Sequence, residues 1–519
     1  MKKYLLTLFI TILVSTTATA QLSKYFSWLG DEQGVTTYRS NNGNSSFEIK
    51  SKGTIEATSD DRGIKSITPD GFLGFSKTTF GNERSILIES DSRGKLSYEY
   101  YVGKKRTDFI PEGKRWMEDV LIEVIRRSGI SAEERVRRFY ARGGVNSVLN
   151  EIEEIESSSV KGTYFGHLMA VGRMNNRELT TVAHKIGTTI SSSSTRGSLY
   201  RKYGNEFLSN NESGRAYFEG LSRISSSSER GSTIRKVLKE IDLNDEMLID
   251  LLDATDKISS SSEKGSILRG FTSNYLDNPQ VVQKYFTVLS HVSSTSEKGS
   301  VLRHAIKENF TNDERVMDAF FNAVDGISSS SEKGSVLRSL LAENRINERN
   351  AERFFQSVGK ISSSTEQGSI LRKTGNLVNQ SSRISDAYFS ILKNISSTTE
   401  KGSTIRTLIK GGELSSNSIH HILDITKSSI SSTTEKGSIL RSLLEYAKLS
   451  DRDYIQLFET VKSISSSTEK GSVLRAAVKV MPRSSSVVDA FKDAVSSISS
   501  DSEYRSVMNA FNGGRSVEE

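Results

Sequence analysis

The sequence lacks cysteine altogether across its 519 residues. Disulfide scaffolds, thiolate zinc sites and cysteine nucleophiles are therefore excluded, whatever the redox state of the compartment. Histidine is scarce as well, and the six histidines share no spacing typical of metal ligands. No residue pattern indicates a catalytic group, so we expect a protein that is not an enzyme and that holds no metal and no cofactor.

Apolar runs long enough to cross a bilayer are also absent. Residues 1–20 have the pattern of a secretory signal peptide, with Lys2 and Lys3 before an apolar stretch and small residues from Ala18 to Ala20. The apolar stretch is short for a membrane span, although an uncleaved anchor is the alternative. We expect an exported mature chain that begins at Gln21, is periplasmic or secreted, and has no transmembrane segment.

A strong excess of one charge is missing too, because the formal net charge is only +7. A weak excess spread over a long chain does not indicate a nucleic-acid-binding surface. We therefore expect no nucleic-acid partner.

What the sequence does contain is one phrase that returns at a fixed interval. It reads SSSSEKGSILR at 259–269, SSTSEKGSVLR at 293–303 and SSSSEKGSVLR at 328–338. Successive glycines lie 34 or 35 residues apart from Gly162 to Gly471. This period predicts a mainly α fold, an α-solenoid of about eleven two-helix repeats over residues 146–519. Tetratricopeptide repeats share the length but not the residue pattern, and pentatricopeptide repeats vary where this phrase is constant.

Each repeat is predicted to hold two helices. Thr311 or Asn312 is expected to cap a first helix, whose apolar stripe runs from Val316 to Ile327. Serines then interrupt the helix, because their side chains compete for backbone hydrogen bonds. Ser329 and Glu332 have the spacing of a capping box at the start of a second helix. The glycine inside that helix costs about 1 kcal/mol relative to alanine, and we expect it to allow close approach of the neighbouring helix.

The amino-terminal part has a different pattern. Residues 21–45 are polar and are predicted to be a linker. Residues 46–110 alternate between apolar and polar, which predicts a small antiparallel β-sheet domain. Residues 111–145 are predicted to be a helical connector whose first helix packs on the sheet and stops at Gly129, after which Ser131 and Glu134 cap the next helix.

An arginine occupies the same place in successive copies of the phrase, and a glutamate usually precedes it by six residues. Six residues is a poor spacing for a pair within one helix, so a salt bridge between adjacent repeats is the favoured interpretation. The alternative is a row of guanidinium groups that binds carboxylates or phosphates. The candidate binding residues are Arg235, Arg269, Arg303, Arg338, Arg372, Arg406, Arg441 and Arg475.

The layout resembles a group of uncharacterised exported bacterial proteins, with a β-rich amino-terminal segment followed by a solenoid similar to HEAT or tetratricopeptide repeats. The resemblance is carried by SGISAEERVRRFYARGG at 128–144 and by the phrase ISSSSEKG of the repeats. It implies residence in the bacterial envelope. Related repeats are attached to some membrane metallopeptidases, but this chain lacks their H-E-x-x-H motif.

Two functions are compatible with these features. The first is a non-enzymatic scaffold of the envelope whose repeats bind a protein or peptide. The second is an envelope enzyme or glycan-binding protein with a site at the junction of sheet and helix, where Tyr98, Tyr100, Tyr101 and Trp116 lie close in the sequence pattern. The same aromatic residues are also suited to a small hydrophobic core.

Overall fold

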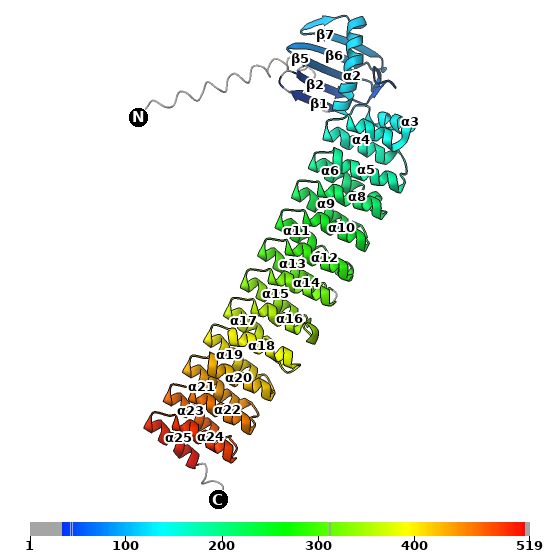
Figure 1. The fold of residues 1–519 in the computed structure, drawn as a ribbon. Coiled ribbons are helices and arrows are strands. Elements are labelled where there is room, and N and C mark those ends of the chain that lie inside the picture. Colours follow the sequence, from blue (N-terminus) through cyan, green and yellow to red (C-terminus); the bar gives the residue numbers. More distant parts are fainter. Residues whose placement is uncertain (1–33, 42, 44, 311–312, 514–519) are drawn as a thin grey trace, which may run out of the picture. The chain divides into compact units, whose positions relative to one another are not determined.

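The computed structural model describes residues 34–41, 43, 45–310 and 313–513 (Figure 1). The predicted signal peptide 1–20, residues 21–33 of the predicted linker and the predicted cap at Thr311 or Asn312 lie outside them. The chain is mainly helical and divides into two compact units, with the boundary between Leu243 and Asn244. The first unit holds an antiparallel sheet followed by helices, and the second holds helices only.

The main sheet has six antiparallel strands in the order β1-β2-β5-β6-β7-β8, and β3 pairs with β4 separately. The strands are β1 (Val35–Asn41), β2 (Ser45–Lys52), β3 (Ile55–Ala57), β4 (Ile64–Ile67), β5 (Phe72–Thr79), β6 (Asn82–Ser90), β7 (Leu96–Val102) and β8 (Lys105–Thr107). The linker prediction is therefore wrong for Val35–Asn41. β1 is an edge strand with no buried side chain, so its sequence carries no apolar alternation.

Helix α2 (Lys114–Ser128) lies across one face of this sheet (Figure 1). Its Leu121, Val124 and Ile125 are fully buried in one cluster with Phe75 and Ile86 of the sheet. Gly129 ends α2 with φ of 75°, a left-handed conformation that glycine adopts without a steric cost. The predicted packing of the first connector helix and its stop are confirmed.

A buried ionic cluster ties the loop between β3 and β4 to the first repeat. Arg135 has a side chain that is only 1% exposed, and its Nη2 lies 3.1 Å from Asp61 Oδ2 and 2.9 Å from Glu151 Oε1. Its Nη1 donates to the Tyr164 hydroxyl. The cap predicted at Ser131 is wrong, because the Ser131 hydroxyl accepts the backbone N–H of Ala57 instead. This side chain therefore joins the connector to β3.

The first unit continues with helices that begin the repeat array. They are α3 (Ala132–Glu153), α4 (Ser158–Val171), α5 (Asn176–Thr189), α6 (Ser193–Lys202), α7 (Gly204–Phe207), α8 (Asn211–Ser222) and α9 (Ser227–Glu240). Non-helical backbone at Gly143 and Gly144 breaks α3 into two segments. The break lies beside the boundary predicted between connector and solenoid.

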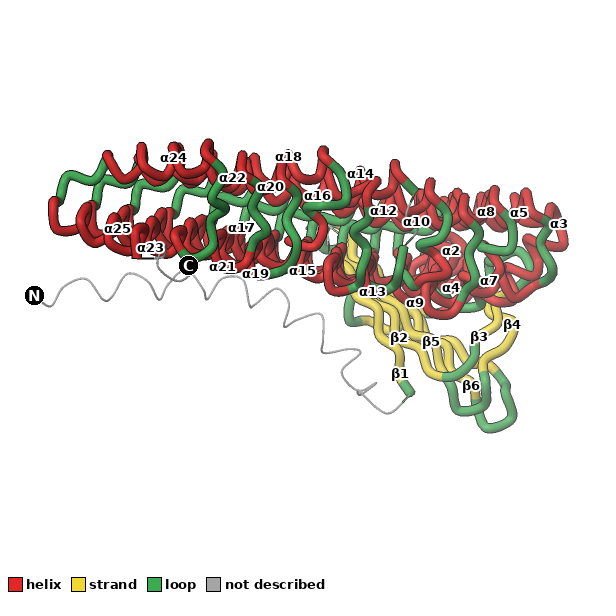
Figure 2. The backbone as a smooth tube through the Cα atoms, turned by 90° about the horizontal axis from the view of Figure 1, so that it is seen from below, coloured by secondary structure: helices red, strands yellow, loops and turns green. Residues whose placement is uncertain are grey.

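The second unit consists of helix pairs stacked in order, with first helices in one layer and second helices in another (Figure 2). The first helices are α10 (Asp245–Asp256), α12 (Pro279–Ser290), α14 (Glu314–Asp325), α16 (Glu348–Gly359), α18 (Ser382–Asn394), α20 (Ser416–Ser429), α22 (Asp451–Lys462) and α24 (Ser485–Ser496). The second helices are α11 (Ser261–Leu268), α13 (Thr295–Lys307), α15 (Ser330–Ala342), α17 (Ser364–Lys373), α19 (Thr398–Lys410), α21 (Thr433–Tyr446), α23 (Ser467–Val478) and α25 (Asp501–Gly513).

The pair α14 and α15 shows how one repeat fills the core. The predicted stripe on α14 is confirmed, since Val316, Phe320 and Val324 are fully buried. Leu337 on α15 is buried as predicted, whereas Leu341, predicted on the same face, is only half-buried. The first helix begins differently from the prediction at Thr311 or Asn312, because the Asp313 side chain accepts the Arg315 N–H at its start.

We predict that Asp61→Asn lowers the free energy of unfolding of the first unit by about 3 kcal/mol, because it leaves the buried Arg135 guanidinium without one of its two carboxylates. The control is Glu133→Gln, which breaks the exposed pair with Arg137 and should cost less than 1 kcal/mol. Urea unfolding followed by the fluorescence of Trp116 measures both. Equal losses in the two variants would contradict a special role for the cluster.

Candidate functional site

The joint between successive repeats begins at the serine that caps each second helix. In α15 the backbone of Ser329 is extended, and its hydroxyl accepts the Glu332 N–H at 3.3 Å. The other half of the predicted capping box is wrong. The Glu332 carboxylate does not return to the Ser329 backbone; it accepts from Arg303 of the preceding repeat.

The same ion pair joins arginine and glutamate of adjacent repeats within each unit. In every case one arginine Nη1 donates to the glutamate that lies 28 or 29 residues later. The pairs are Arg201–Glu229 (2.6 Å), Arg269–Glu297 (2.7 Å), Arg303–Glu332, Arg338–Glu366, Arg372–Glu400 (2.8 Å), Arg406–Glu435, Arg441–Glu469 (2.9 Å) and Arg475–Glu503 (2.7 Å). The favoured interpretation, a salt bridge between repeats, is confirmed for these pairs.

The arginines often hold a second acceptor on the next repeat. Arg372 Nη1 reaches Thr404 Oγ1 at 3.3 Å, and Arg475 Nη1 reaches Ser506 Oγ at 3.2 Å. The paired arginine side chains are half-buried, with 26 to 33% of their surface exposed. Arg235 is half-buried on α9, at the end of the first unit. The alternative role of these arginines in ligand binding stays a prediction.

The glycine of the phrase leaves room for the incoming glutamate. A Cβ built on Gly334 would overlap the Glu366 carboxylate, and a Cβ on Gly368 would lie 2.6 Å from Glu400 Oε2. The expectation that glycine allows the neighbouring helix itself to approach is therefore wrong for these positions. The atoms that occupy the space belong to a side chain, which lies between the glycine and the arginine four residues later.

Copies that lack one member of this arrangement lack its partner as well. The copy at 157–166 has Gly166 at the arginine position, and the next copy has Thr195 at the glutamate position. Thr195 Cγ2 then occupies the space over Gly162. The arginine and the glutamate are thus absent together here, whereas Gly162 is retained.

Serine hydroxyls make a second connection along the edge where the second helices begin. Ser330 Oγ lies 2.8 Å from Ser362 Oγ of the next repeat, and Ser364 Oγ lies 2.8 Å from Ser396 Oγ. Ser364 also accepts the Ser397 N–H at 3.3 Å. These contacts give the serines that follow the cap a structural role between repeats.

A row of buried cations just before the glycines was not identified from the sequence. Lys401 Nζ donates to the carbonyl of Lys393 at 2.9 Å and to that of Ser429 at 3.0 Å. These carbonyls end α18 and α20, so one ammonium joins the carboxyl ends of two first helices. Lys333 and Lys470 make equivalent contacts. The signal in the sequence was the basic residue that precedes the glycine in every glycine-marked copy except the one at Gln367.

Burial lowers the pKa of these lysines, because the protein replaces water around the charged form. The affected residues are Lys161, Lys298, Lys333, Lys401, Lys436 and Lys470. Carbonyl groups at a helix carboxyl end carry partial negative charge and favour a cation. The ammonium therefore supplies hydrogen bonds that the last turn of a helix lacks.

Ion pairs also bridge the outer surfaces of several neighbouring first helices. Arg353 Nη2 of α16 lies 2.8 Å from Asp325 Oδ2 of α14, and Lys462 Nζ of α22 lies 2.7 Å from Asp493 Oδ2 of α24. These pairs differ in residue type and direction from one groove to the next. The outer surface is thus chemically variable, whereas the joints between repeats are nearly constant.

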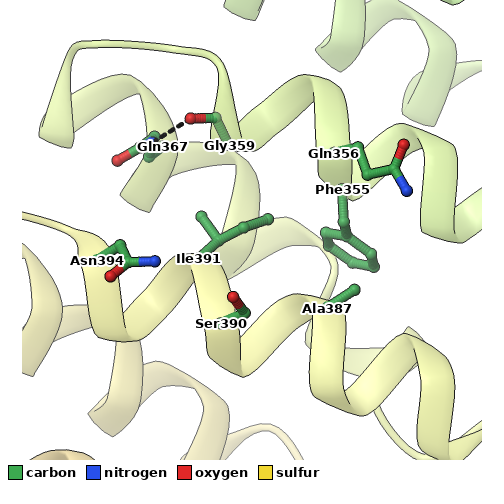
Figure 3. A pocket seen from close by; sticks show the side chains of 8 residues that line it. All are labelled: Phe355, Gln356, Gly359, Gln367, Ala387, Ser390, Ile391 and Asn394. Carbon is green, nitrogen blue, oxygen red and sulfur yellow. Dashed lines mark hydrogen bonds between the residues drawn. The ribbon is translucent and has the colours of Figure 1, made fainter.

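One such groove, between α16 and α18, contains a pocket of about 260 Å³ (Figure 3). Phe355 and Ile391 form its apolar wall, and the exposed Gln356, Ser390 and Asn394 lie around it. A second pocket, of about 500 Å³, lies at the other end of the helices, between the last turns of α17 and α19. It is lined by Lys373, Glu413 and several glycines.

Three of the aromatic residues proposed for a glycan site, Tyr98, Tyr100 and Trp116, belong to the core of the first unit, whereas the half-buried Tyr101 donates its hydroxyl to Glu99. Tyr100 is fully buried, and its ring centroid lies 6.0 Å from that of Trp116. Tyr98 stacks on Phe109 with 4.7 Å between ring centroids. These contacts favour the hydrophobic-core interpretation of the aromatic group.

Histidines pair with carboxylates or rings rather than with one another. His291 Nδ1 lies 2.9 Å from Asp256 Oδ1, and the His421 ring stacks on Phe389. Within residues 34–41, 43, 45–310 and 313–513, no group of three or more histidine, aspartate or glutamate residues could hold a metal ion. None of the helices in these ranges is both long and apolar enough to span a bilayer.

No protein-family model matches the chain, and no curated protein matches it. Among solved structures, the chain is similar to the Chs5-Bch1 exomer cargo adaptor complex, at 8% identity and a TM-score of 0.18, over 86% of this chain and 85% of that one. It is also similar to a circular tandem repeat protein with novel repeat topology, at 11% identity and a TM-score of 0.14, over 78% and 91% of the two chains. TM-scores this low carry no argument about function.

We predict that the effect of Gly334→Ala changes sign with the residue at position 366. In the parent protein, the new methyl group displaces the Glu366 carboxylate and should cost at least 1 kcal/mol of unfolding free energy. In a Glu366→Ala background only the end of the flexible Arg338 side chain remains near the new methyl group, 3.1 Å from it, so alanine should stabilise α15 by up to about 1 kcal/mol through its higher helix propensity. A double-mutant cycle by chemical denaturation measures the coupling, and equal effects in both backgrounds would refute it.

Proposed function

We propose that this protein is a non-enzymatic scaffold of the bacterial envelope that binds a protein or peptide along its helical repeats. The observation that carries the proposal is the difference between the constant and the variable residues. The constant residues of the phrase form the contacts between repeats. The exposed positions of the first helices change from repeat to repeat.

Variable outer positions suit a chemically heterogeneous ligand. At one equivalent position the first helices α12, α14, α16 and α18 carry Thr287, Asn322, Gln356 and Ser390, all exposed. A polymer of identical units would be matched by identical repeats, whereas a polypeptide presents a different side chain at each step. The varied surface therefore favours a protein or peptide over a uniform glycan or nucleic acid.

The glycan-binding or enzymatic alternative loses its main support, because Tyr98, Tyr100 and Trp116 are used in the core between sheet and α2. The second pocket is compatible with a small polar ligand, since it combines charged side chains with glycine backbone. No nucleophile with a positioned base accompanies it among its lining residues.

Export belongs to the same proposal. It rests on the signal-peptide pattern of residues 1–20. Expression of the full chain in a bacterium should yield a periplasmic or secreted protein whose intact mass corresponds to cleavage before Gln21. A cytoplasmic, full-length product would contradict export, and a membrane-bound full-length product would favour the uncleaved anchor.

The binding function is tested by cross-linking and capture from envelope extracts with the mature chain. The captured partner is then purified and its Kd measured for two variants whose helix content matches the parent. The surface variant carries Gln283→Glu, Thr287→Glu and Arg349→Glu, all at exposed positions. The joint variant carries Arg338→Gln and Arg372→Gln.

We expect binding to weaken at least tenfold in the surface variant and to change little in the folded joint variant. If binding weakens in the joint variant and changes little in the surface variant, the binding residues are the arginines between repeats. A chain that captures no protein and instead turns over a substrate would overturn the proposed function.

A further inference from the structure

The groove between α16 and α18 differs from the neighbouring grooves at the position of the buried cation. Gln367 stands where the other glycine-marked copies have lysine or arginine. Its Nε2 lies 3.4 Å from the Gly359 carbonyl and 3.5 Å from the Val358 carbonyl, which is at the limit for a hydrogen bond (Figure 3). Both carbonyls belong to α16, so these bonds do not join α16 to α18.

The other repeats show what these carbonyl groups hold when a lysine is present. Lys333 Nζ contacts the carbonyls of Asp325 and Lys360, which are equivalent by position to those of Gly359 and Asn394. Lys401 Nζ likewise donates to the carbonyls of Lys393 and Ser429, at the ends of α18 and α20. The protein therefore contains internal examples of a primary ammonium bound between the carboxyl ends of two first helices.

Small residues open the groove at this repeat. Gly359 occupies the position that Asp325 has in the preceding repeat, and Ala387 occupies that of Arg353. The Arg353–Asp325 bridge that covers the preceding groove thus has no counterpart here. The pocket of about 260 Å³ results from these replacements.

The pocket combines an apolar wall with neutral polar groups. Ile391 is 8% exposed and offers apolar surface for a methylene chain, whereas Phe355 beside it is fully buried. Gln356, Ser390 and Asn394 contribute amide and hydroxyl oxygens at the opening. Neither a cation nor a carboxylate lines the pocket, and the helix carboxyl ends of α16 and α18 favour positive charge.

We propose that this pocket binds a primary ammonium group, supplied by a lysine side chain of the partner polypeptide. The methylene stem of the lysine packs on Ile391, as long basic side chains do when only the charged end is polar. The ammonium takes the place that Lys333 or Lys401 fills from within the chain in other repeats. This inference rests on the proposed function, because it identifies the chemistry of the partner that the repeats bind.

The probe for the test is Nα-acetyl-lysine-N-methylamide, compared with the norleucine analogue, which has a similar chain without the ammonium. A single side chain binds weakly, at millimolar Kd, so saturation-transfer difference NMR on the mature chain is the suitable measurement. We expect signals from the lysine methylene protons and at least tenfold weaker binding of the norleucine probe.

Two variants close the pocket in different ways. Gln367→Lys supplies the internal ammonium found in other repeats, and Gly359→Met fills the space with an uncharged side chain on a helix. Both should weaken binding of the lysine probe at least tenfold. Gln380→Lys, at an exposed position outside the pocket, is the matched control and should bind like the parent.

A third variant tests whether removal of the buried lysine from another repeat creates a binding site. The groove between α12 and α14 also lacks an arginine at the bridging position, where it has Ala319, but there Lys298 Nζ donates to the Ser290 carbonyl at 3.1 Å. Lys298→Gln should therefore add a second site for the lysine probe in a protein of unchanged helix content.

The inference is overturned if the norleucine probe binds as well as lysine, or if Gln367→Lys binds the lysine probe as the parent does. Failure of the inference is distinguishable from failure of the proposed function. A captured partner that binds parent and Gln367→Lys equally would leave the function intact and refute the lysine pocket. A chain that binds the lysine probe but captures no polypeptide would support the pocket and refute the function.

Discussion

The contact between an arginine of one repeat and the glutamate of the next, over a glycine, determines how the repeats are placed on one another. The glutamate lies in the first turn of a second helix, and the arginine lies one turn after the glycine in the second helix of the preceding repeat. Glycine is required because the carboxylate lies where a side chain would begin. A change at one of these positions therefore acts on the others. The arginine is absent at Gly166 and the glutamate at Thr195, so this pair is lost as a whole.

This contact is not the main source of stability. A half-buried ion pair contributes at most about 1 kcal/mol, and the helical glycine costs a similar amount. Each fully buried leucine, valine or phenylalanine contributes about 1.5–3 kcal/mol, and a repeat such as α14 and α15 buries several of them. The apolar residues thus supply the free energy of stacking. The ion pair, the serine hydroxyls and the buried lysines specify the register, because an offset would leave their charges and hydrogen bonds unsatisfied.

With the register supplied by constant residues, the outer surface of the first helices can vary without loss of the stack. The groove between α16 and α18 shows the consequence. With Gly359, Ala387 and Gln367 in place of aspartate, arginine and lysine, the helices keep their places, but only the long contacts of an uncharged amide reach carbonyl groups that an ammonium binds elsewhere. The proposed binding position thus arises because this repeat lacks the charged residues of its neighbours while it keeps the same stacking of helices.

Several of these features followed from the sequence because they repeat or depend on local patterns. The 34–35-residue period, the two helices per repeat, the serine caps, the stop at Gly129 and the partner of the arginines were all predictable from spacing and periodicity. β1 was not, because this edge strand has no fully buried side chain and its sequence shows no apolar alternation. Nor was the second half of the capping box, since the Glu332 carboxylate had two possible donors, the Ser329 N–H and the Arg303 guanidinium, and only the position of Arg303 in the stack decided between them. The lysine contacts and the pocket beside Gln367 also required the tertiary structure, because they depend on carbonyl groups of two helices about 34 residues apart, whose distance no local pattern determines.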